Sequence, residues 1–343
     1  MISVIMPIYN GEDYIENSVN KILNQPYKDI ELILINDGST DKTDMICKNY
    51  AIADKRVKYI CKQNEGICKT RNLGLRIASG EYVSFIDQDD EINDNIFESL
   101  YNGFDVDIDL VVGGKVMKLI DDIGNVIEEK VYEYDCCIAS GEEILFRLMN
   151  LNRDMSLLHI WNCLYKKDII DKYGIRFDDT FKFGHEDSLF NIEYVSRCTK
   201  IRYISAVVYN YYRRKNKSTS LKKNTGYVND YSHYINRASQ ALSNRLCNET
   251  LTDIFFVYCL RLGVALYSQY SSKADKELCR KNLNSIRNAL TACCGYISPK
   301  RVTSRTINGM PLMFYIKLSA YLMEVQDYRL FMTVIKIKER MVS

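Results

Sequence analysis

The chain has 343 residues and a net charge of +2, and 47% of its residues are hydrophobic and 26% charged. This composition is ordinary for a soluble globular protein of one or two domains. The sequence has no uninterrupted apolar run of about 18 residues, so no transmembrane helix is predicted.

The twelve cysteines form no zinc-like C-x-x-C pair. Cys136 and Cys137 are adjacent, as are Cys293 and Cys294, a spacing that suits neither a metal site nor a disulfide framework. The opening run Met1–Met6 is too short for the hydrophobic part of a signal peptide and has no basic start. We therefore expect reduced thiols and a cytoplasmic location.

The small net charge hides an asymmetry between the two halves of the chain. Residues 1–150 hold 15 Lys and Arg against 28 Asp and Glu, whereas residues 151–343 hold 31 against 16. The basic half could attract an anionic lipid, a pyrophosphate or nucleic acid, or the two halves could neutralise each other across an interface. Because no nucleic-acid-binding motif accompanies the charge, we do not expect a nucleic-acid partner.

Strand and helix patterns alternate along the first 90 residues. Ile2–Met6 is typical of a strand, which we expect Pro7 to end because proline cannot donate to a central ladder. Glu12–Leu23 has helical spacing of its apolar residues. The alternation continues with the strands Glu31–Ile35 and Val57–Cys61 and the helices Lys42–Ala51 and Ile67–Ala78. Short connections of this kind predict a parallel α/β sheet with right-handed crossovers.

The apolar run Tyr82–Ile86 is typical of a buried strand and stops at the carboxylates Asp87, Asp89 and Asp90. Open α/β sheets bind their ligands at the carboxyl ends of the strands. Carboxylate oxygens suit Mg²⁺ or Mn²⁺, which usually stay bound to substrate phosphates as well. The alternative is a solvated acidic turn that caps the next helix, near Asn93 or Asp94.

Two other nucleotide-binding classes lack their motifs here. No G-x-G-x-x-G follows the first strand, as a dinucleotide-binding fold would require, and no P-loop G-x-x-x-x-G-K is present.

Four short motifs follow one another at strand ends and helix starts: Pro7–Asn10, Asn36–Asp41, Asn64–Gly66 with Arg71-Asn72, and Asp87–Asp90. In this order they resemble the signature of glycosyltransferase family 2, whose members are inverting enzymes of the GT-A fold that use nucleotide sugars. The resemblance covers about the first 220 residues. It implies an α/β fold with a Rossmann-like, mostly parallel sheet flanked by helices. We expect a nucleotide-sugar-binding catalytic domain over residues 1–222 and a helical extension over residues 223–343.

The resemblance also implies a donor site. Its residues are Pro7, Tyr9, Asp37, Asn64, Arg71 and Asp87. Tyr9 is similar to the aromatic residue that stacks on the base. Asp37 is similar to the carboxylate that accepts from the imide N–H of uracil or thymine, although it could equally cap its own turn. Arg71 resembles the arginine that contacts the nucleotide or diphosphate; a surface salt bridge is the alternative.

A metal site is implied beside the donor. Asp87 would lie near the ribose and the metal, and Asp89 would bind the Mn²⁺ or Mg²⁺ directly. The cation would bridge both phosphates and neutralise the leaving diphosphate.

The middle of the chain holds a predicted hairpin and the one tryptophan. Leu110–Val116 and Val126–Tyr132 alternate like strands around a turn at residues 121–125. Trp161 lies in a W-N-x-L-Y-K-K element that family members often carry beside the acceptor sugar, although a lone tryptophan is more often part of a core. Short helices are expected after Ser140 and at Asp168.

A second chemical cluster follows at Phe183–Phe190. Its apolar spacing predicts a helix with Glu186 and Asp187 in the first turn, where the helix N-terminus stabilises a carboxylate. Both could be plain helix-end charges. Family members place an E-D pair here, and Asp187 matches the residue taken as general base, flanked by Glu186 and by His185 on the acceptor side. One base on the acceptor hydroxyl suffices for a single inversion.

A strand at Val207–Tyr212 runs into a basic loop. By resemblance this loop folds over the donor diphosphate, with Arg213 and Ser218 as the contacting residues. A solvated basic turn is the alternative.

Four helices are predicted in the motif-poor remainder: Tyr227–Ser243, Leu251–Ser268, Lys276–Leu290 and Leu312–Arg340. The last is basic and amphipathic, so it could rest on an anionic membrane surface. Packing on the catalytic domain or a homodimer interface are the alternatives.

The sequence thus predicts a metal-dependent, inverting glycosyltransferase that moves a sugar from a nucleotide diphosphate, favoured to be a UDP-sugar, to a glycan. The acceptor could be lipid-linked at the inner face of the cell membrane, as in capsule, O-antigen or teichoic-type pathways. A sugar nucleotidyltransferase would need a glycine-rich basic loop after the first strand. An inactive sugar-nucleotide-binding scaffold would not need the acidic residues Asp87, Asp89 and Asp187.

Overall fold

The computed structural model describes residues 1–149, 156–182, 184–215, 218 and 226–244, and single positions at 252, 255, 258, 259, 288 and 289. The chain divides into two compact units. The first comprises Met1–Ile144, Asp154–Lys182 and Glu186–Lys222, and the second comprises Leu145–Arg153, Phe183–His185 and Lys223–Ser343. The segments 145–153 and 183–185 therefore group with the second unit, although the predicted division at residue 222 assigns them to the first.

The first unit begins with the predicted alternation of strands and helices. Parallel strands lie in the order β3-β2-β1-β4. They are β1 (Ile2–Ile8), β2 (Ile30–Asn36), β3 (Val57–Cys61) and β4 (Tyr82–Phe85), connected by α1 (Ile15–Leu23), α2 (Thr43–Ala53) and α3 (Ile67–Ile77). Each predicted element is present, with its ends shifted by up to three residues.

The expectation that Pro7 ends the first strand is wrong, because β1 continues to Ile8. Pairing of β1 with β4 stops at Ile5, whose carbonyl accepts from the amide of Ile86. The backbone N–H and C=O groups of successive β1 residues point in turn to β4 and to β2. The carbonyl of Ile8 points to β2, where it accepts from the amide of Asp37. Pro7 therefore faces the side where β4 has already ended, so its missing N–H leaves no ladder bond unmade.

The second half of the sheet is mixed. Its strands are β5 (Glu91–Ile92), β6 (Leu110–Ile120), β7 (Val126–Tyr132), β8 (Cys137–Ser140), β9 (Cys163–Lys166) and β10 (Lys200–Arg214). They extend the order as β4-β9-β6-β10-β5, where β6 and β10 are parallel and β9 and β5 run antiparallel to their neighbours. The predicted hairpin of β6 and β7 is confirmed. The sheet, which the sequence predicts to be mostly parallel, is thus parallel over the strands β1 to β4 and mixed beyond them.

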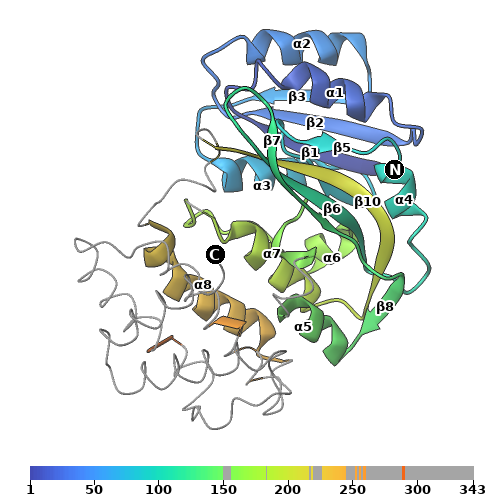
Figure 1. Cartoon of the computed structure of the whole chain (residues 1–343), viewed down its shortest axis with the longest axis vertical. Coiled ribbons are helices and arrows are strands. Elements are labelled where there is room, and N and C mark those ends of the chain that lie inside the picture. Colours follow the sequence, from blue (N-terminus) through green and yellow to red (C-terminus); the bar gives the residue numbers. More distant parts are fainter. Residues whose placement is uncertain are drawn as a thin grey trace. The chain divides into compact units, whose positions relative to one another are not determined.

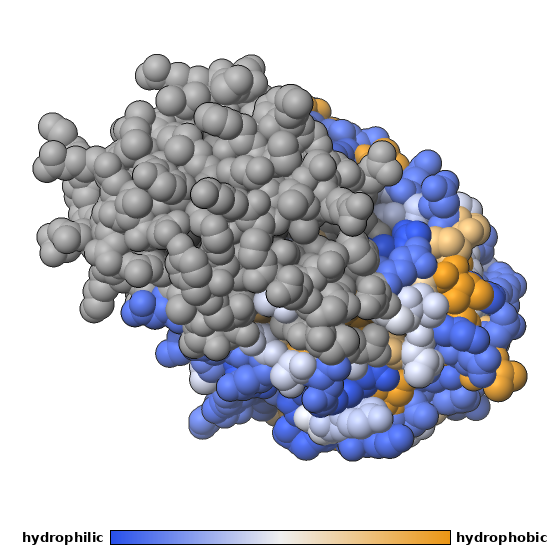
Figure 2. Space-filling view, turned by 90° about the horizontal axis from the view of Figure 1, so that it is seen from below, coloured by the Kyte–Doolittle hydropathy of each residue, from blue (hydrophilic) through white to orange (hydrophobic). Residues whose placement is uncertain are grey.

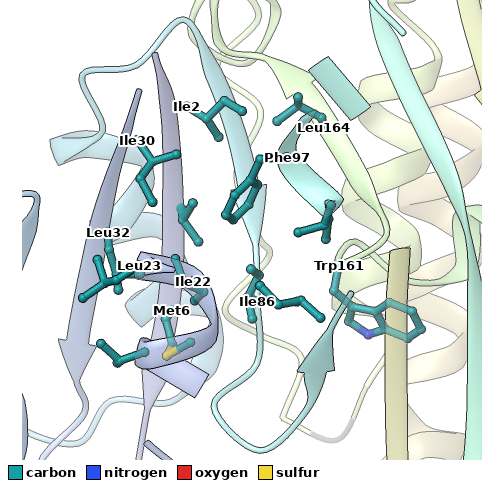
Figure 3. Close-up of a cluster of buried hydrophobic side chains, with 14 of the residues drawn as sticks. Ile2, Met6, Ile22, Leu23, Ile30, Leu32, Ile86, Phe97, Trp161 and Leu164 are labelled. Carbon is teal, nitrogen blue, oxygen red and sulfur yellow. The ribbon is translucent and has the colours of Figure 1, made fainter. Parts of the chain in front are cut away.

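Helices cover both faces of the sheet in the first unit (Figure 1). On one face, α1, α2 and α4 (Ile96–Tyr101) bury apolar side chains against alternate residues of β1 and β2. Figure 3 shows this cluster, in which Ile22 and Leu23 of α1 and Phe97 of α4 meet Ile2 and Leu32 of the strands. This burial fixes the strands whose ends carry the motifs.

The opposite face carries α3 and α7 (Glu186–Val195). Gly74 of α3 lies so close to Ile5 and Ile35 that an added Cβ would collide with Ile5. Phe190 of α7 packs edge-on against Phe85 of β4 and stacks on Phe177. The amino-terminal ends of α3 and α7 are thereby held at the carboxyl edge of the sheet, where β4 ends. The short helix α6 (Lys167–Lys172) begins beside the predicted Asp168.

The second unit contains the helix α8 (Gly226–Leu242), which matches the first predicted carboxyl-terminal helix. The helix α5 (Glu142–Met149) spans the boundary between the two units and begins where the capping pattern predicts. Apart from the single positions above, the predicted helices Leu251–Ser268 and Lys276–Leu290 lie outside the described residues, as does all of Leu312–Arg340.

None of the helices within the described residues has both the length and the apolarity needed to cross a bilayer. On the face seen in Figure 2, the coloured residues are mainly hydrophilic, and hydrophobic ones form small separate groups among them.

Candidate active site

The loops after β1 and β2 are bonded to each other at the carboxyl edge of the sheet. Asn10, at a φ of 48°, accepts from the amide of Thr40 at 2.9 Å and donates its own amide to Ser39 Oγ at 2.9 Å. Asparagine is among the few residues that tolerate this left-handed conformation. The amide of Gly11 donates to Thr43 Oγ1 at 2.8 Å. These bonds fix the backbone beside Tyr9, whose side chain is 48% exposed.

Gln88 connects the end of β1 to the acidic loop after β4. Its Nε2 donates to the carbonyl of Tyr9 and its Oε1 accepts from the amide of Tyr9, both at 3.0 Å. A Cβ at Gly11 would collide with this amide group, so a larger residue there would displace the Gln88 side chain from Tyr9. Sequence reasoning missed this role, because nothing in the D-x-D pattern says where the middle side chain points.

Asp37 is 5% exposed and holds the loop that leads into α3. Its carboxylate accepts from the amides of Glu65 and Gly66, both at 2.9 Å, and forms an ion pair with Lys62. Burial alone would raise the pKa of Asp37, but Lys62 and the two amide donors lower it below its ordinary value. Asp37 thus stays ionised and caps a neighbouring loop, rather than its own turn. Asn64 lies in that loop.

Arg71 joins three carboxylates from different parts of the chain. It is on α3 and only 1% exposed. Its guanidinium contacts Asp87 after β4 at 3.0 Å, Asp187 at the start of α7 at 2.7 Å, and Glu186 at 3.5 Å. The guanidinium is buried and the three carboxylates are only partly exposed, so the alternative of a surface salt bridge is wrong. The predicted diphosphate contact, metal ligand and base therefore lie within one cluster.

Burial and the neighbouring charges of the Arg71 cluster shift the pKa of Asp187. Burial raises this pKa to about 8, with Glu186 and Asp87 adding to the rise and Arg71 opposing it. The aromatic ring of Phe177 lies 5.3 Å from the guanidinium carbon and shields the cluster on that side. A carboxylate with a pKa near neutrality can exchange a proton at working pH.

The three carboxylates after β4 have different surroundings. Asp90 is buried and accepts from the hydroxyl of Tyr209 at 3.0 Å and the amide of Tyr212 at 2.9 Å. Burial raises its pKa well above the ordinary value, and the charges of Asp89 and Asp87 raise it further. Asp90 therefore anchors the loop to β10, while Asp87 and Asp89 remain the partly exposed pair.

Comparison with known proteins assigns the family. The model of glycosyl transferase family 2 matches residues 3–174, half of the chain. The chain belongs to this family. Its match to the glycosyltransferase GlyA of Streptococcus pneumoniae is 34% identical and covers 62% of the chain and 31% of GlyA. The match to EpsJ of Bacillus subtilis, an uncharacterised glycosyltransferase, is 27% identical and covers 64% of the chain and 63% of EpsJ. The chain thus spans less than two thirds of each of these two relatives.

Two staphylococcal proteins extend the comparison. The chain is 32% identical to the poly(ribitol-phosphate) beta-N-acetylglucosaminyltransferase TarP of Staphylococcus aureus, over 70% of the chain and 72% of TarP. The crystal structure of S. aureus TarS 1–349 in complex with UDP-GlcNAc superposes with a TM-score of 0.74 at 18% identity, covering 99% of the chain and 91% of TarS 1–349. The structural likeness confirms the fold expected of a family 2 glycosyltransferase.

In this family 2 chain, the neighbouring residues Arg213 and Arg214 at the end of β10 have different surroundings. Arg214, which the sequence analysis did not single out, donates to the carboxylate of Asp89 at 2.6 Å and to its carbonyl at 2.6 Å. Arg213, the predicted diphosphate ligand, lies near His159. Burial lowers the pKa of His159 most, the charge of Lys115 lowers it further, and the charge of Arg213 adds a smaller effect. Adjacent residues of a strand face opposite sides of the sheet, which explains the difference. Ser218 accepts from the amide of Arg214 at 2.8 Å.

Trp161 lies in the core. It is 1% exposed, its ring stacks on Tyr209 at 4.3 Å and on His159 at 4.8 Å, and Lys115 lies 5.0 Å from its centre. Figure 3 shows its indole at the margin of the hydrophobic cluster. Because the ring is enclosed, it offers no surface to an acceptor sugar, and the packing alternative describes Trp161 better than the predicted acceptor contact.

His185 belongs to the second unit. Its backbone has a φ of 73°, and its ring lies against Tyr231 and Tyr234 of α8, with ring centres 5.6 and 5.0 Å apart. Its contact with an acceptor stays a prediction.

Proposed function

We propose that this chain is an inverting, metal-dependent glycosyltransferase that moves a sugar from a UDP-linked donor to a hydroxyl group of a cell-surface glycan. The observation that carries the proposal is the buried Arg71 cluster. In this cluster Arg71 contacts both Asp87 after β4, which we assign to the donor side, and Asp187 at the start of α7, which we assign to the acceptor side.

Asp187 is the proposed general base. It would accept the proton of the acceptor hydroxyl as that oxygen attacks the anomeric carbon from the side opposite the diphosphate. Arg71 and the start of α7 hold its carboxylate in place, and the raised pKa suits proton exchange near neutral pH. Glu186, at the longer distance from Arg71, is proposed to support this charge arrangement. A single displacement with one base inverts the configuration.

The donor assignment is supported by the strand ends and by the relatives. Tyr9 is 48% exposed and is proposed to stack on the base. Pro7 precedes it near the end of β1, Asp37 holds the loop that leads into α3, and Asn64 lies in that loop. The TarS structure holds UDP-GlcNAc, and the name of TarP specifies transfer of N-acetylglucosamine to poly(ribitol phosphate). By extension, we propose a UDP-sugar as donor, and Arg213 and Ser218 as contacts of its diphosphate.

Asp87 and Asp89 are the proposed ligands of the divalent ion, either Mn²⁺ or Mg²⁺. Burial raises the pKa of Asp89, and the charge of Asp87 adds to this effect against that of Arg214. Clustered carboxylates of this kind fit a hard cation. Among the residues described, no group of three or more His, Cys, Asp or Glu side chains is suited to a metal, but in phosphate sites one or two carboxylates suffice because substrate oxygens complete the shell. When bound, the ion would neutralise the leaving diphosphate.

The proposed acceptor is a growing cell-surface polymer. TarP carries poly(ribitol-phosphate) in its name, and GgaB of Bacillus subtilis, 31% identical over 75% of the chain and 28% of GgaB, is named a minor teichoic acid biosynthesis protein. We place the reaction in the cytoplasm at the inner face of the membrane, where a lipid-linked acceptor would be presented.

A donor screen tests the proposal. UDP-sugars in the presence of Mn²⁺ should raise the melting temperature of the protein, because a ligand that binds only the folded state stabilises it by mass action. GDP- and dTDP-sugars should give smaller shifts, and EDTA should abolish the shift. Equal shifts with every nucleotide, or shifts that EDTA does not change, would contradict the donor and metal assignments. Stabilisation by UDP-sugars without any sugar transfer would favour the inactive scaffold, and formation of a UDP-sugar from UTP and a sugar phosphate would favour the nucleotidyltransferase.

A further inference from the structure

Asp89 already has a cationic partner. The guanidinium of Arg214 contacts its carboxylate at 2.6 Å and its carbonyl oxygen at 2.6 Å. Two short charge-assisted bonds to one residue place the guanidinium firmly. The side chain of Asp89 is 37% exposed and that of Arg214 is 14% exposed. An ion from solvent can therefore reach the carboxylate of Asp89 while Arg214 stays largely covered.

Within the described part of the chain, no carboxylate other than that of Asp89 forms an ion pair with Arg214, and two aromatic rings flank its guanidinium. Its guanidinium carbon lies 4.7 Å from the ring centre of Tyr14 and 5.7 Å from that of Tyr212. Its backbone amide donates to Ser218 Oγ, and its carbonyl accepts from the Ser218 amide at 3.0 Å. Arg214 thus connects the acidic loop to the segment proposed to contact the diphosphate.

The guanidinium, which contacts Oδ2, and a divalent ion would compete for the carboxylate of Asp89. We propose that Arg214 is the counter-ion of Asp89 while the donor is absent, that it yields this carboxylate to the divalent ion, and that the freed guanidinium then binds the donor diphosphate. This inference rests on the proposed function and adds a second diphosphate residue to it. One positive group is exchanged for another at Asp89, so the acid is never left uncompensated.

The exchange predicts effects of opposite sign on two ligands. With Arg214→Gln, the affinity for free Mn²⁺ should rise by about tenfold, because the competing charge-assisted bonds are gone. The affinity for UDP at saturating Mn²⁺ should fall by about tenfold or more, because a phosphate contact is lost. A residue that only supported the fold would weaken both ligands together. Arg214→Lys keeps the charge and should fall between the wild type and the glutamine variant for both.

The experiment is a titration of Mn²⁺ followed by the electron paramagnetic resonance signal of the free ion, without and with UDP. Arg202→Gln is the matched control, since Arg202 lies on the same strand and contacts Asp105, also at 2.6 Å. The control should leave both affinities unchanged.

The outcomes separate this inference from the function on which it rests. If the wild-type protein binds no UDP with Mn²⁺, the proposed function fails. If the wild type binds both but Arg214→Gln leaves the affinity for Mn²⁺ unchanged or weakens it, the exchange at Asp89 is wrong. Should Arg214→Gln unfold, the lysine variant decides, because tighter Mn²⁺ binding together with weaker UDP binding is expected of it too.

Discussion

Replacement of Asp187 by asparagine should lower the rate of sugar transfer by about 10²- to 10⁴-fold, the usual contribution of a general base. The asparagine cannot take the proton of the acceptor hydroxyl. Donor affinity should stay within about twofold of the wild type, because Asp87 and Glu186 still balance the charge of Arg71. The fall should therefore appear in kcat, measured as UDP released per enzyme in the presence of acceptor.

Glu186→Gln is the matched control for this variant. Glu186 is the neighbouring residue on α7 and contacts the same guanidinium, but at 3.5 Å rather than 2.7 Å. Its loss should cost less transfer activity than the loss of Asp187. An asparagine variant at position 187 that turns over at the wild-type rate would remove Asp187 from the role of base, and a larger loss in Glu186→Gln would transfer the role to Glu186.

The largest effect on stability is expected for Arg71→Met. Methionine approximates the volume of the side chain but leaves Asp87, Asp187 and Glu186 without their shared cation. Breaking a buried ion pair from one side costs about 3–5 kcal/mol, because the remaining charges stay desolvated. The free energy of unfolding, measured by denaturant titration at pH 8, should fall by this amount.

The pH dependence of the Arg71→Met variant gives the sign of the effect. Without Arg71, which opposes the rise, the pKa of Asp187 in the folded state should lie still further above its unfolded value. The folded state then binds more protons, so the stability deficit should shrink as the pH falls from 8 towards 5. Arg56→Met is the comparison, because Arg56 pairs with Asp54 at 2.7 Å in a partly exposed site and its loss should cost about 1 kcal/mol or less. Equal costs for the two variants would mean that the Arg71 cluster is not a buried charge network.

The residues of the candidate site could be named from the sequence because the motifs lie at strand ends and helix starts. Apolar periodicity predicts those elements, and parallel strands bring their carboxyl ends to one edge. What the sequence could not show is that Arg71 reaches Asp87 and Asp187, which are 16 and 116 residues away. Contacts over such separations depend on how α3 and α7 pack against one face of the sheet.

At three further places the structure gives what the sequence could not, because the outcome depends on neighbouring strands and side chains and not on the local sequence pattern. Pro7 is compatible with β1 only because β4 is shorter than β2 at that point. Choosing between Arg213 and Arg214 requires the face of β10 that each occupies, and that strand begins seven residues before the predicted one, with irregular register against β6. Trp161 could be assigned to core or acceptor only once its stacking on Tyr209 was known.

The most direct measurement is a diffraction structure of this protein grown with UDP and Mn²⁺, collected at a wavelength where manganese scatters anomalously. The account predicts a manganese peak bound to the carboxylates of Asp87 and Asp89, a diphosphate between that peak and the end of β10, and uracil against Tyr9. A nucleotide bound elsewhere on the chain, or a manganese peak remote from both aspartates, would contradict it.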